Sequence, residues 1–150
     1  RAPEGLQLAE DSRLTPIPID EAASSLSAIL LDEDYYLFLK SMVRVVDGIP
    51  LLDEAAIIPF KARAWLDLTR DREAGGKVDE KNIRKHRNDV ARLLQLLSPE
   101  ASYALPDAVA RDLRSFVDLA TVDNDYDPRQ FKVNMTREDV ATRLRATYQL

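Results

Sequence analysis

Residues 57–97 read IIPFKARAWLDLTRDREAGGKVDEKNIRKHRNDVARLLQLL, and they hold two amphipathic helical patterns separated by a glycine-containing turn. In the first pattern, Ile57, Ala64 and Leu68 form an apolar stripe at helical spacing. Lys61 lies in line with this stripe. A lysine on a buried helix face extends its ammonium group to solvent, pairs with an acid or binds a ligand. Lys61 is therefore a candidate functional residue.

The second pattern carries two titratable residues. His86 lies within the apolar stripe, and Asp89 lies at its edge, about one helical turn away. The stripe itself consists of Ile83, Val90, Leu94 and Leu97. Because buried charges need partners, we expect Lys61, His86 and Asp89 to satisfy one another across the two helices. A structural salt bridge and a functional site both remain open as interpretations of this group.

Local signals delimit the two helices. Asp53 predicts the start of the first helix, with Pro59 as an early-turn residue or a kink, and the glycine pair at 75–76 predicts its end. Asp79 predicts the start of the second helix, and Pro99 predicts its end. The short connection favours an antiparallel helical hairpin.

The remaining elements complete a mainly helical (α+β) fold. Asp20 predicts a helix through Leu31, Pro106 predicts another at its first turn, and Thr136 predicts a last one. Between residues 43 and 52, Asp-Gly separates two β-branched runs and indicates a β-hairpin. The sequence therefore predicts a bundle of about five to six helices with one small β-hairpin near residues 43–52.

The chain divides into two unequal parts. Residues 1–19 contain a proline-interrupted apolar segment and predict a linker or edge strand that continues from a missing upstream domain. Residues 20–150 predict the helical domain. Because the chain starts at Arg1 rather than at methionine, we expect it to be a piece of a longer protein.

The composition restricts the classes of function. The chain has 150 residues, 45% of them hydrophobic, with no cysteine and one histidine. Disulfide scaffolds, thiolate zinc sites, cysteine nucleophiles and multi-histidine metal sites are thereby excluded. No apolar run approaches the roughly 20 residues that span a bilayer, and no signal-peptide pattern opens the chain. We therefore expect a cytoplasmic protein with no membrane contact.

The charge is unevenly distributed. The net charge of the chain is -5, but residues 61–92 hold ten Lys and Arg against six Asp and Glu. A basic helix pair on an acidic body either binds phosphate groups or forms an ordinary solvated face. Both interpretations stay open from the sequence.

Two segments resemble a known family. Residues 59–68 (Pro-Phe-Lys-Ala-Arg-Ala-Trp-Leu-Asp-Leu) and residues 83–90 (Ile-Arg-Lys-His-Arg-Asn-Asp-Val) are similar to the post-catalytic helices of abortive-infection (AbiE-type) toxin nucleotidyltransferases. These enzymes belong to the DNA polymerase beta-like superfamily. The resemblance extends over residues 23–97.

The match rests on short motifs. Lys61 with Ala64 resembles the family's Leu-Lys-x-x-Ala motif, and residues 85–89 resemble its Lys-Asp-x-x-Asp helix. His86 stands where the family usually has the first acid. The family's catalytic carboxylates lie in a Gly-Ser…Asp-x-Asp pattern, which this chain does not contain.

The resemblance implies a function for the chain as the C-terminal accessory region of a nucleotidyltransferase, without catalytic residues of its own and inactive alone. The full-length enzyme would transfer a nucleotide from a nucleoside triphosphate to an RNA or protein acceptor, with Mg2+ held by upstream carboxylates. It also implies a cognate antitoxin as a partner. The substrate-binding residues implied by the resemblance are Lys61, Asp89, His86, Lys85 and Arg63.

Roles follow from side-chain chemistry within that resemblance. Lys61 would contact phosphate, because a compact ammonium meets a triphosphate as a point charge. Asp89 would orient Lys61 or the incoming nucleotide. Arg63, Lys85 and Arg87 are candidates for acceptor contacts.

Two other functions are compatible with the sequence. One is a non-enzymatic helical protein-interaction module, whose charge asymmetry sets the orientation of its partner. The other is a nucleic-acid-binding helical domain that uses residues 77–92 and whose affinity falls steeply with salt.

Overall fold

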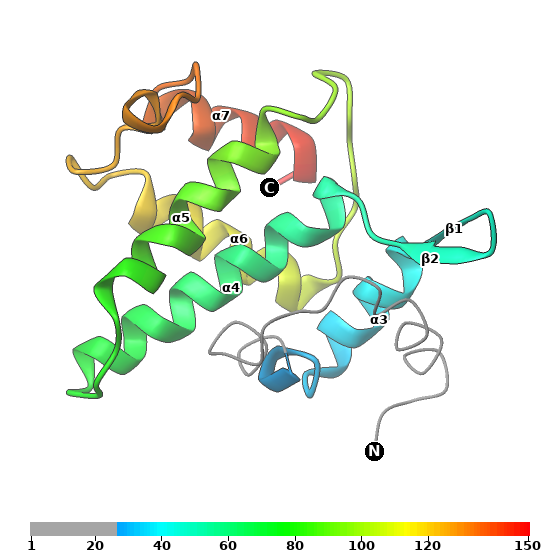
Figure 1. Cartoon of the computed structure of the whole chain (residues 1–150), viewed down its shortest axis with the longest axis horizontal. Helices are drawn as coiled ribbons and strands as arrows, with labels where there is room; N and C mark the ends of the chain where they lie inside the picture. The colour runs from blue at the N-terminus through cyan, green and yellow to red at the C-terminus, as the bar shows by residue number, and fades with distance from the viewer. Residues whose placement is uncertain (1–26) are drawn as a thin grey trace.

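The structure of the chain is a computed structural model that describes residues 27–150, and this part is mainly helical (Figure 1). The elements in chain order are α3 (Glu33–Met42), β1 (Arg44–Val46), β2 (Ile49–Leu51), α4 (Glu54–Glu73), α5 (Glu80–Leu94), α6 (Asp107–Ala120), the 3-10 helix η1 (Pro128–Phe131) and α7 (Arg137–Tyr148). The predicted fold class, a mainly α bundle with one small β-hairpin, is confirmed.

Two predictions concern the start of the chain. The linker or edge strand at residues 1–19 lies outside the described residues, as does the start of the helix predicted from Asp20. Residues 27–29 are helical, within the range predicted for that helix.

Helices α4 and α5 form the predicted antiparallel hairpin and lie side by side (Figure 1). The Asp53 side chain accepts a hydrogen bond from the amide of Ala56 and caps α4. Asp79 caps α5 in the same way. Between the helices, Gly75 has a φ of 88°, a conformation that glycine adopts at no steric cost. The capping residues predicted from the sequence are therefore confirmed.

The predicted end of the second helix is wrong by about one turn. Helix α5 ends at Leu94 and not at Pro99. The amides of Leu96 and Leu97 donate to the carbonyls three residues earlier, so the chain tightens into turns before the proline is reached. Proline disfavours helix in the residue before it but does not determine where a helix ends further upstream.

The β-hairpin has the predicted turn. Val46 pairs with Ile49, which leaves Asp47 and Gly48 as the two turn residues. Their φ values of 52° and 78° place both in the left-handed region that a type I′ turn requires. The Asp-Gly pair thus sets the register of β1 and β2.

Helix α4 occupies the centre of the fold. It packs against α3, α5 and α6, so it buries side chains on more than one face. The stripe predicted for it is only partly correct, because Ile57 and Leu68 are half-buried whereas Ala64 is buried. Among the residues that form its main core contact are Ala55, Ile58, Ala62, Trp65 and Leu66. A central helix has no single apolar stripe, which explains the error.

Helices α6 and α7 form a second layer behind α4 and α5 in the view of Figure 1. Pro106 is the N-cap residue of α6 and thus stands one position before the predicted first turn. Thr136 begins α7 in a capping box with Asp139. None of the helices between residues 27 and 150 has the length and apolar character needed to cross a membrane.

Candidate functional site

Lys61 and Asp89 meet across the α4–α5 hairpin. The Lys61 Nζ atom lies 3.1 Å from Asp89 Oδ2, and the two side chains are 27% and 19% exposed. The structure thus brings together two residues that the sequence predicted as a pair. Their contact joins the two helices, and part of the Lys61 side chain stays open to solvent.

A second cation shares the same carboxylate. The Arg92 Nη1 atom lies 3.1 Å from the other oxygen of Asp89, Oδ1, and the Arg92 side chain is 45% exposed. We refer to Lys61, Asp89 and Arg92 as the Lys61 cluster. It contains two positive charges and one negative charge, so it retains a positive surplus that can attract an anion.

Arg92 also lies against an aromatic pair. Its guanidinium carbon lies 4.8 Å from the centre of the Phe131 ring, which stacks on Tyr126 at a centroid distance of 6.4 Å. On the other side of the pair, the guanidinium carbon of Arg87 lies 4.6 Å from the centre of the Tyr126 ring. Arginine and aromatic side chains thus form a continuous stack along one side of α5.

Two polar contacts close this stack. The Tyr126 hydroxyl donates to the carbonyl of Arg87, at 3.1 Å, and Arg87 Nη1 donates to Asp123, at 2.8 Å. The loop at residues 122–134, between α6 and α7, contains η1 and the buried Tyr126. This loop is therefore packed on α5 and supports Arg92.

The sequence carried a signal for Arg92 but none for Phe131. Asp89 and Arg92 are three residues apart on a helix, a spacing that predicts contact. Phe131 meets Arg92 only because the loop folds back on α5. No local pattern could have indicated that contact.

His86 is buried beside the Lys61 cluster, and its Nδ1 atom has no hydrogen-bond partner. Burial and the nearby charge of Lys61 lower the pKa of the imidazole to about 4, against the opposing effect of Asp89. His86 is therefore neutral at pH 7. The expectation that all three titratable residues satisfy one another therefore holds for Lys61 and Asp89 but not for His86 Nδ1, which has no hydrogen-bond partner among the described residues.

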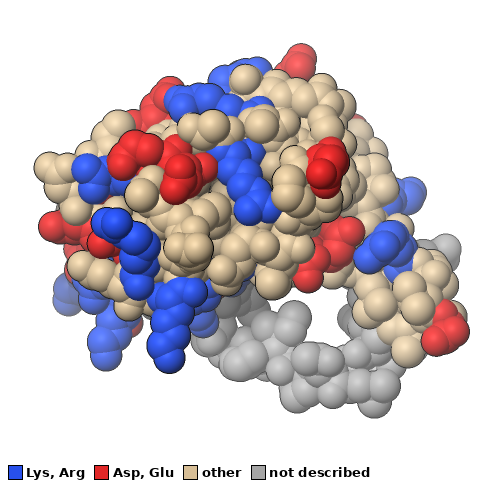
Figure 2. Space-filling view, turned by 90° about the horizontal axis from the view of Figure 1, so that it is seen from above, with Lys and Arg blue, Asp and Glu red and all other residues tan. Residues whose placement is uncertain are grey.

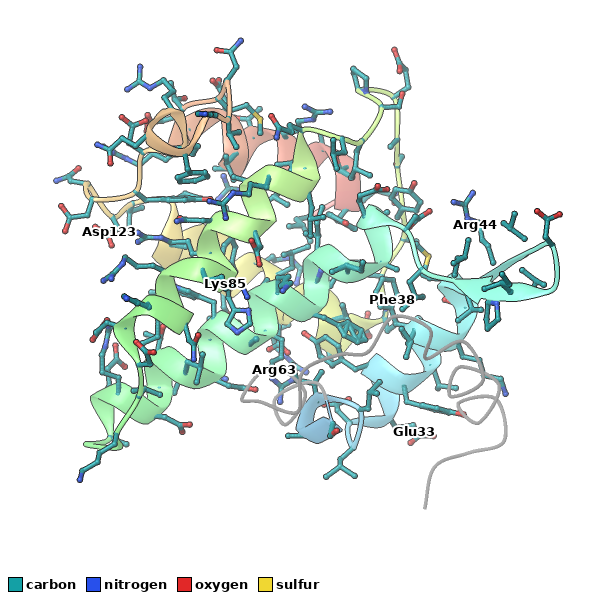
Figure 3. All side chains as sticks on the ribbon, viewed as in Figure 1. Glu33, Phe38, Arg44, Arg63, Lys85 and Asp123 are labelled. Carbon is teal, nitrogen blue, oxygen red and sulfur yellow. The ribbon has the colours of Figure 1, made fainter. Side chains whose placement is uncertain are left out.

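Arg63 belongs to a different group of residues, on the side of α4 that faces α3 (Figure 3). It donates to Asp67 at 3.0 Å and to Asp112 on α6 at 2.9 Å, and its guanidinium carbon lies 5.2 Å from the centre of the Tyr35 ring. Tyr35 in turn donates to Asp112 at 2.9 Å. We refer to Arg63, Asp67, Asp112 and Tyr35 as the Arg63 cluster. It links α3, α4 and α6.

The electrostatics of the Arg63 cluster favour a structural role. Burial raises the pKa of the Tyr35 hydroxyl, and Asp112 raises it further, so Tyr35 stays a neutral donor. Burial opposes the charge of Arg63, but Asp67 and Asp112 raise its pKa overall. The structure thus separates Arg63 from the other predicted site residues.

Lys85 is exposed on α5 and forms no ion pair within residues 27–150 (Figure 3). Other exposed basic side chains surround it in the chain, and basic residues project from the side of the molecule where α4 and α5 lie (Figure 2). The exposed basic residues near Lys85 in the chain are Lys77, Lys81 and Arg84. The basic surplus of this segment is therefore largely solvent-facing.

Magnesium does not fit the described side chains. Between residues 27 and 150, no three His, Asp or Glu residues converge as ligands of a metal ion need to. The acids of the two clusters are instead paired with Lys or Arg.

Searches against protein families, curated proteins and solved structures found no match.

Proposed function

We propose that this chain is the C-terminal accessory region of a nucleotidyltransferase similar to the AbiE-type toxins, and that Lys61 contacts the triphosphate of the nucleotide. The observation that carries the proposal is the partly exposed Lys61–Asp89 pair, which lies across the helical hairpin in a cluster with a positive surplus. The partial exposure of the Lys61 side chain and the positive surplus together favour the approach of an anion.

Each residue of the site has a distinct part in the proposal. Lys61 supplies a point charge for phosphate oxygens, and Asp89 holds its ammonium between the two helices. His86 adds no charge at pH 7 and fills the space beside them. Lys85 lies in the exposed basic surface and is suited to contacts with an acceptor. Arg63 is withdrawn from the site, because its donors bind Asp67 and Asp112.

The rest of the reaction depends on residues outside this chain. In the proposal, carboxylates of an upstream region hold Mg2+, which supplies charge stabilisation for the transferred phosphoryl group. An acceptor oxygen forms a bond to the α-phosphorus while pyrophosphate leaves. The acceptor is an RNA or a protein, a cognate antitoxin is a further partner, and the location is the cytoplasm. The 150 residues alone transfer no nucleotide, and detectable transfer by them would contradict this proposal.

Calorimetry of magnesium-triphosphate binding tests the site. The full-length protein is compared with its Lys61→Ala variant and with a matched control, Lys40→Ala, which removes an exposed lysine at the end of α3. We expect the affinity to fall about tenfold or more in Lys61→Ala, the loss of one charge-assisted contact, and to stay unchanged in Lys40→Ala. Equal binding by all three proteins would remove Lys61 from the site.

A non-enzymatic interaction module is the second candidate. The observation in its favour is the β-hairpin, whose Val45, Val46, Ile49 and Leu51 side chains are exposed. If the protein is such an interaction module, the folded, full-length protein should bind no triphosphate. The same calorimetric series therefore decides between the two functions.

A further inference from the structure

Arg92 and Lys61 approach one carboxylate from two helices. Each cation lies 3.1 Å from a different oxygen of Asp89. The distance between the Lys61 ammonium and the Arg92 guanidinium is therefore at most the sum of these two contacts and the distance between the two oxygens of Asp89. A polyphosphate carries anionic oxygens along its whole length, so one ligand can meet both cations.

Arg92 has donors to spare. A guanidinium carries five N–H donors, and among the described residues Arg92 uses one nitrogen, Nη1, for Asp89. Its side chain is 45% exposed, more than that of Lys61. The remaining donors are of the kind that forms bidentate contacts with phosphate.

The aromatic stack orders this side chain in advance. Phe131 lies against the guanidinium, Tyr126 lies against Phe131, and the Tyr126 hydroxyl is bound to the backbone of α5. An arginine free in solvent loses rotamer freedom when it binds a ligand, which lowers the affinity. Arg92 has already lost part of that freedom in the folded protein. Its position therefore favours ligand binding beyond what a surface arginine offers.

We propose that Arg92 is a second phosphate-binding residue of the Lys61 site, held for that purpose by Phe131 and Tyr126. This inference rests on the proposed function, since it assigns a further ligand to the same triphosphate. Asp89 then serves as the bridge that keeps both cations in place. The positive surplus of the cluster is the charge that the ligand neutralises.

Titration of the chain with inorganic tripolyphosphate at low salt tests the inference. The variants are Arg92→Gln, Lys61→Gln and a matched control, Arg114→Gln, which removes an exposed arginine on α6. All three variants lower the net charge equally. We expect Arg92→Gln and Lys61→Gln each to weaken binding about tenfold, and Arg114→Gln to weaken it less than about twofold.

The outcomes separate the two proposals. If wild-type chain binds no tripolyphosphate, the proposed phosphate site fails and the role of Arg92 fails with it. If Lys61→Gln loses affinity while Arg92→Gln behaves like Arg114→Gln, the inference about Arg92 alone is overturned. The triphosphate site would then rest on Lys61 without a second cation.

An NMR measurement on the wild-type chain keeps the inference testable if Arg92→Gln fails to fold. The Nε–H resonance of Arg92 can be assigned by selective labelling and followed during the same titration. Direct contact shifts this resonance in step with binding. Tripolyphosphate binding without any shift of this resonance would show that Arg92 does not contact the phosphate. Arg92 would then only hold Asp89 in place, and the inference would be overturned.

Discussion

Lys61 and Arg63 are two residues apart on α4, yet they belong to clusters of opposite charge balance. The Lys61 cluster has two cations for one carboxylate. Arg63 instead pairs with three carboxylates, those of Asp67, Asp112 and, at 3.8 Å, Asp32, and the only other arginine paired with them in the described residues is Arg70, 3.8 Å from Asp67. The side chains of Lys61 and Arg63 are almost equally exposed, at 27% and 23%. Exposure therefore does not distinguish the two residues. Charge balance and the number of partners do.

This difference indicates that Lys61 is suited to bind a ligand, whereas Arg63 stabilises the fold. Arg63 donates to side chains on its own helix and on α6 and lies over a ring from α3. Removing it takes one partner from Asp67, which keeps Arg70 at 3.8 Å, and one from Asp112, which keeps the Tyr35 hydroxyl at 2.9 Å. Lys61 has one partner, Asp89, which keeps Arg92 when Lys61 is removed. Removal of Arg63 is therefore expected to lower the stability of the fold, whereas removal of Lys61 is expected to reduce mainly the charge that a ligand meets.

The largest effect is expected from Arg63→Ala, which removes the guanidinium partner of the half-buried Asp112 and the shorter of the two arginine contacts of Asp67. We expect the free energy of unfolding to fall by about 3 kcal/mol, the size typical of breaking a partly buried ion network. Chemical denaturation measures this change. A loss of less than about 1 kcal/mol would mean that the Arg63 cluster contributes no more than an exposed ion pair.

The next effect concerns pH and His86. Its pKa is lowered to about 4 in the folded protein from 6.5, so the unfolded chain takes up the proton first as the pH falls. The free energy of unfolding is therefore at its full value above pH 6.5, where His86 is neutral in both states, and it decreases as the pH falls towards 4. We expect a loss of about 2 kcal/mol between pH 7 and pH 5, measured by denaturation at each pH.

A variant isolates the contribution of His86 from that of the carboxylates. In His86→Asn, which cannot titrate, the pH dependence between pH 7 and pH 5 should largely disappear. In Lys61→Met, a weaker pH dependence is expected, because the charge that lowers the pKa of His86 is gone. An unchanged pH dependence in His86→Asn would assign it to other groups.

The smallest effect is expected from Lys61→Met itself at pH 7. Its ion pair with Asp89 is partly exposed, and Asp89 keeps Arg92, so we expect a change of less than about 1 kcal/mol in the free energy of unfolding. Denaturation under the conditions used for Arg63→Ala makes the two values comparable. A loss as large as that of Arg63→Ala would make Lys61 a structural residue and remove the contrast between the clusters.

Much of the secondary structure could be predicted from the sequence because its signals are local. Asp53, Asp79 and Thr136 cap their helices through contacts within three residues, and the Asp47–Gly48 turn sets the hairpin register. The Lys61–Asp89 pair was also predictable, since a short antiparallel connection brings the two helices together.

The partners of Arg63 and Arg92 depend on the tertiary structure, because they come from segments that are distant in the sequence. The sequence by itself determined where α4, α5 and α7 begin, the β-hairpin and the pairing of Lys61 with Asp89, but not α3 or the end of α5. Arg63 was separated from that site by Asp112 on α6 and Tyr35 on α3, and Arg92 was supported by Phe131 from a loop without a recognisable pattern. Capping and turn formation depend on neighbouring residues, whereas partners for a charge on a central helix come from whichever elements pack around it. That packing determines which cation is held by the fold and which stays open to a ligand.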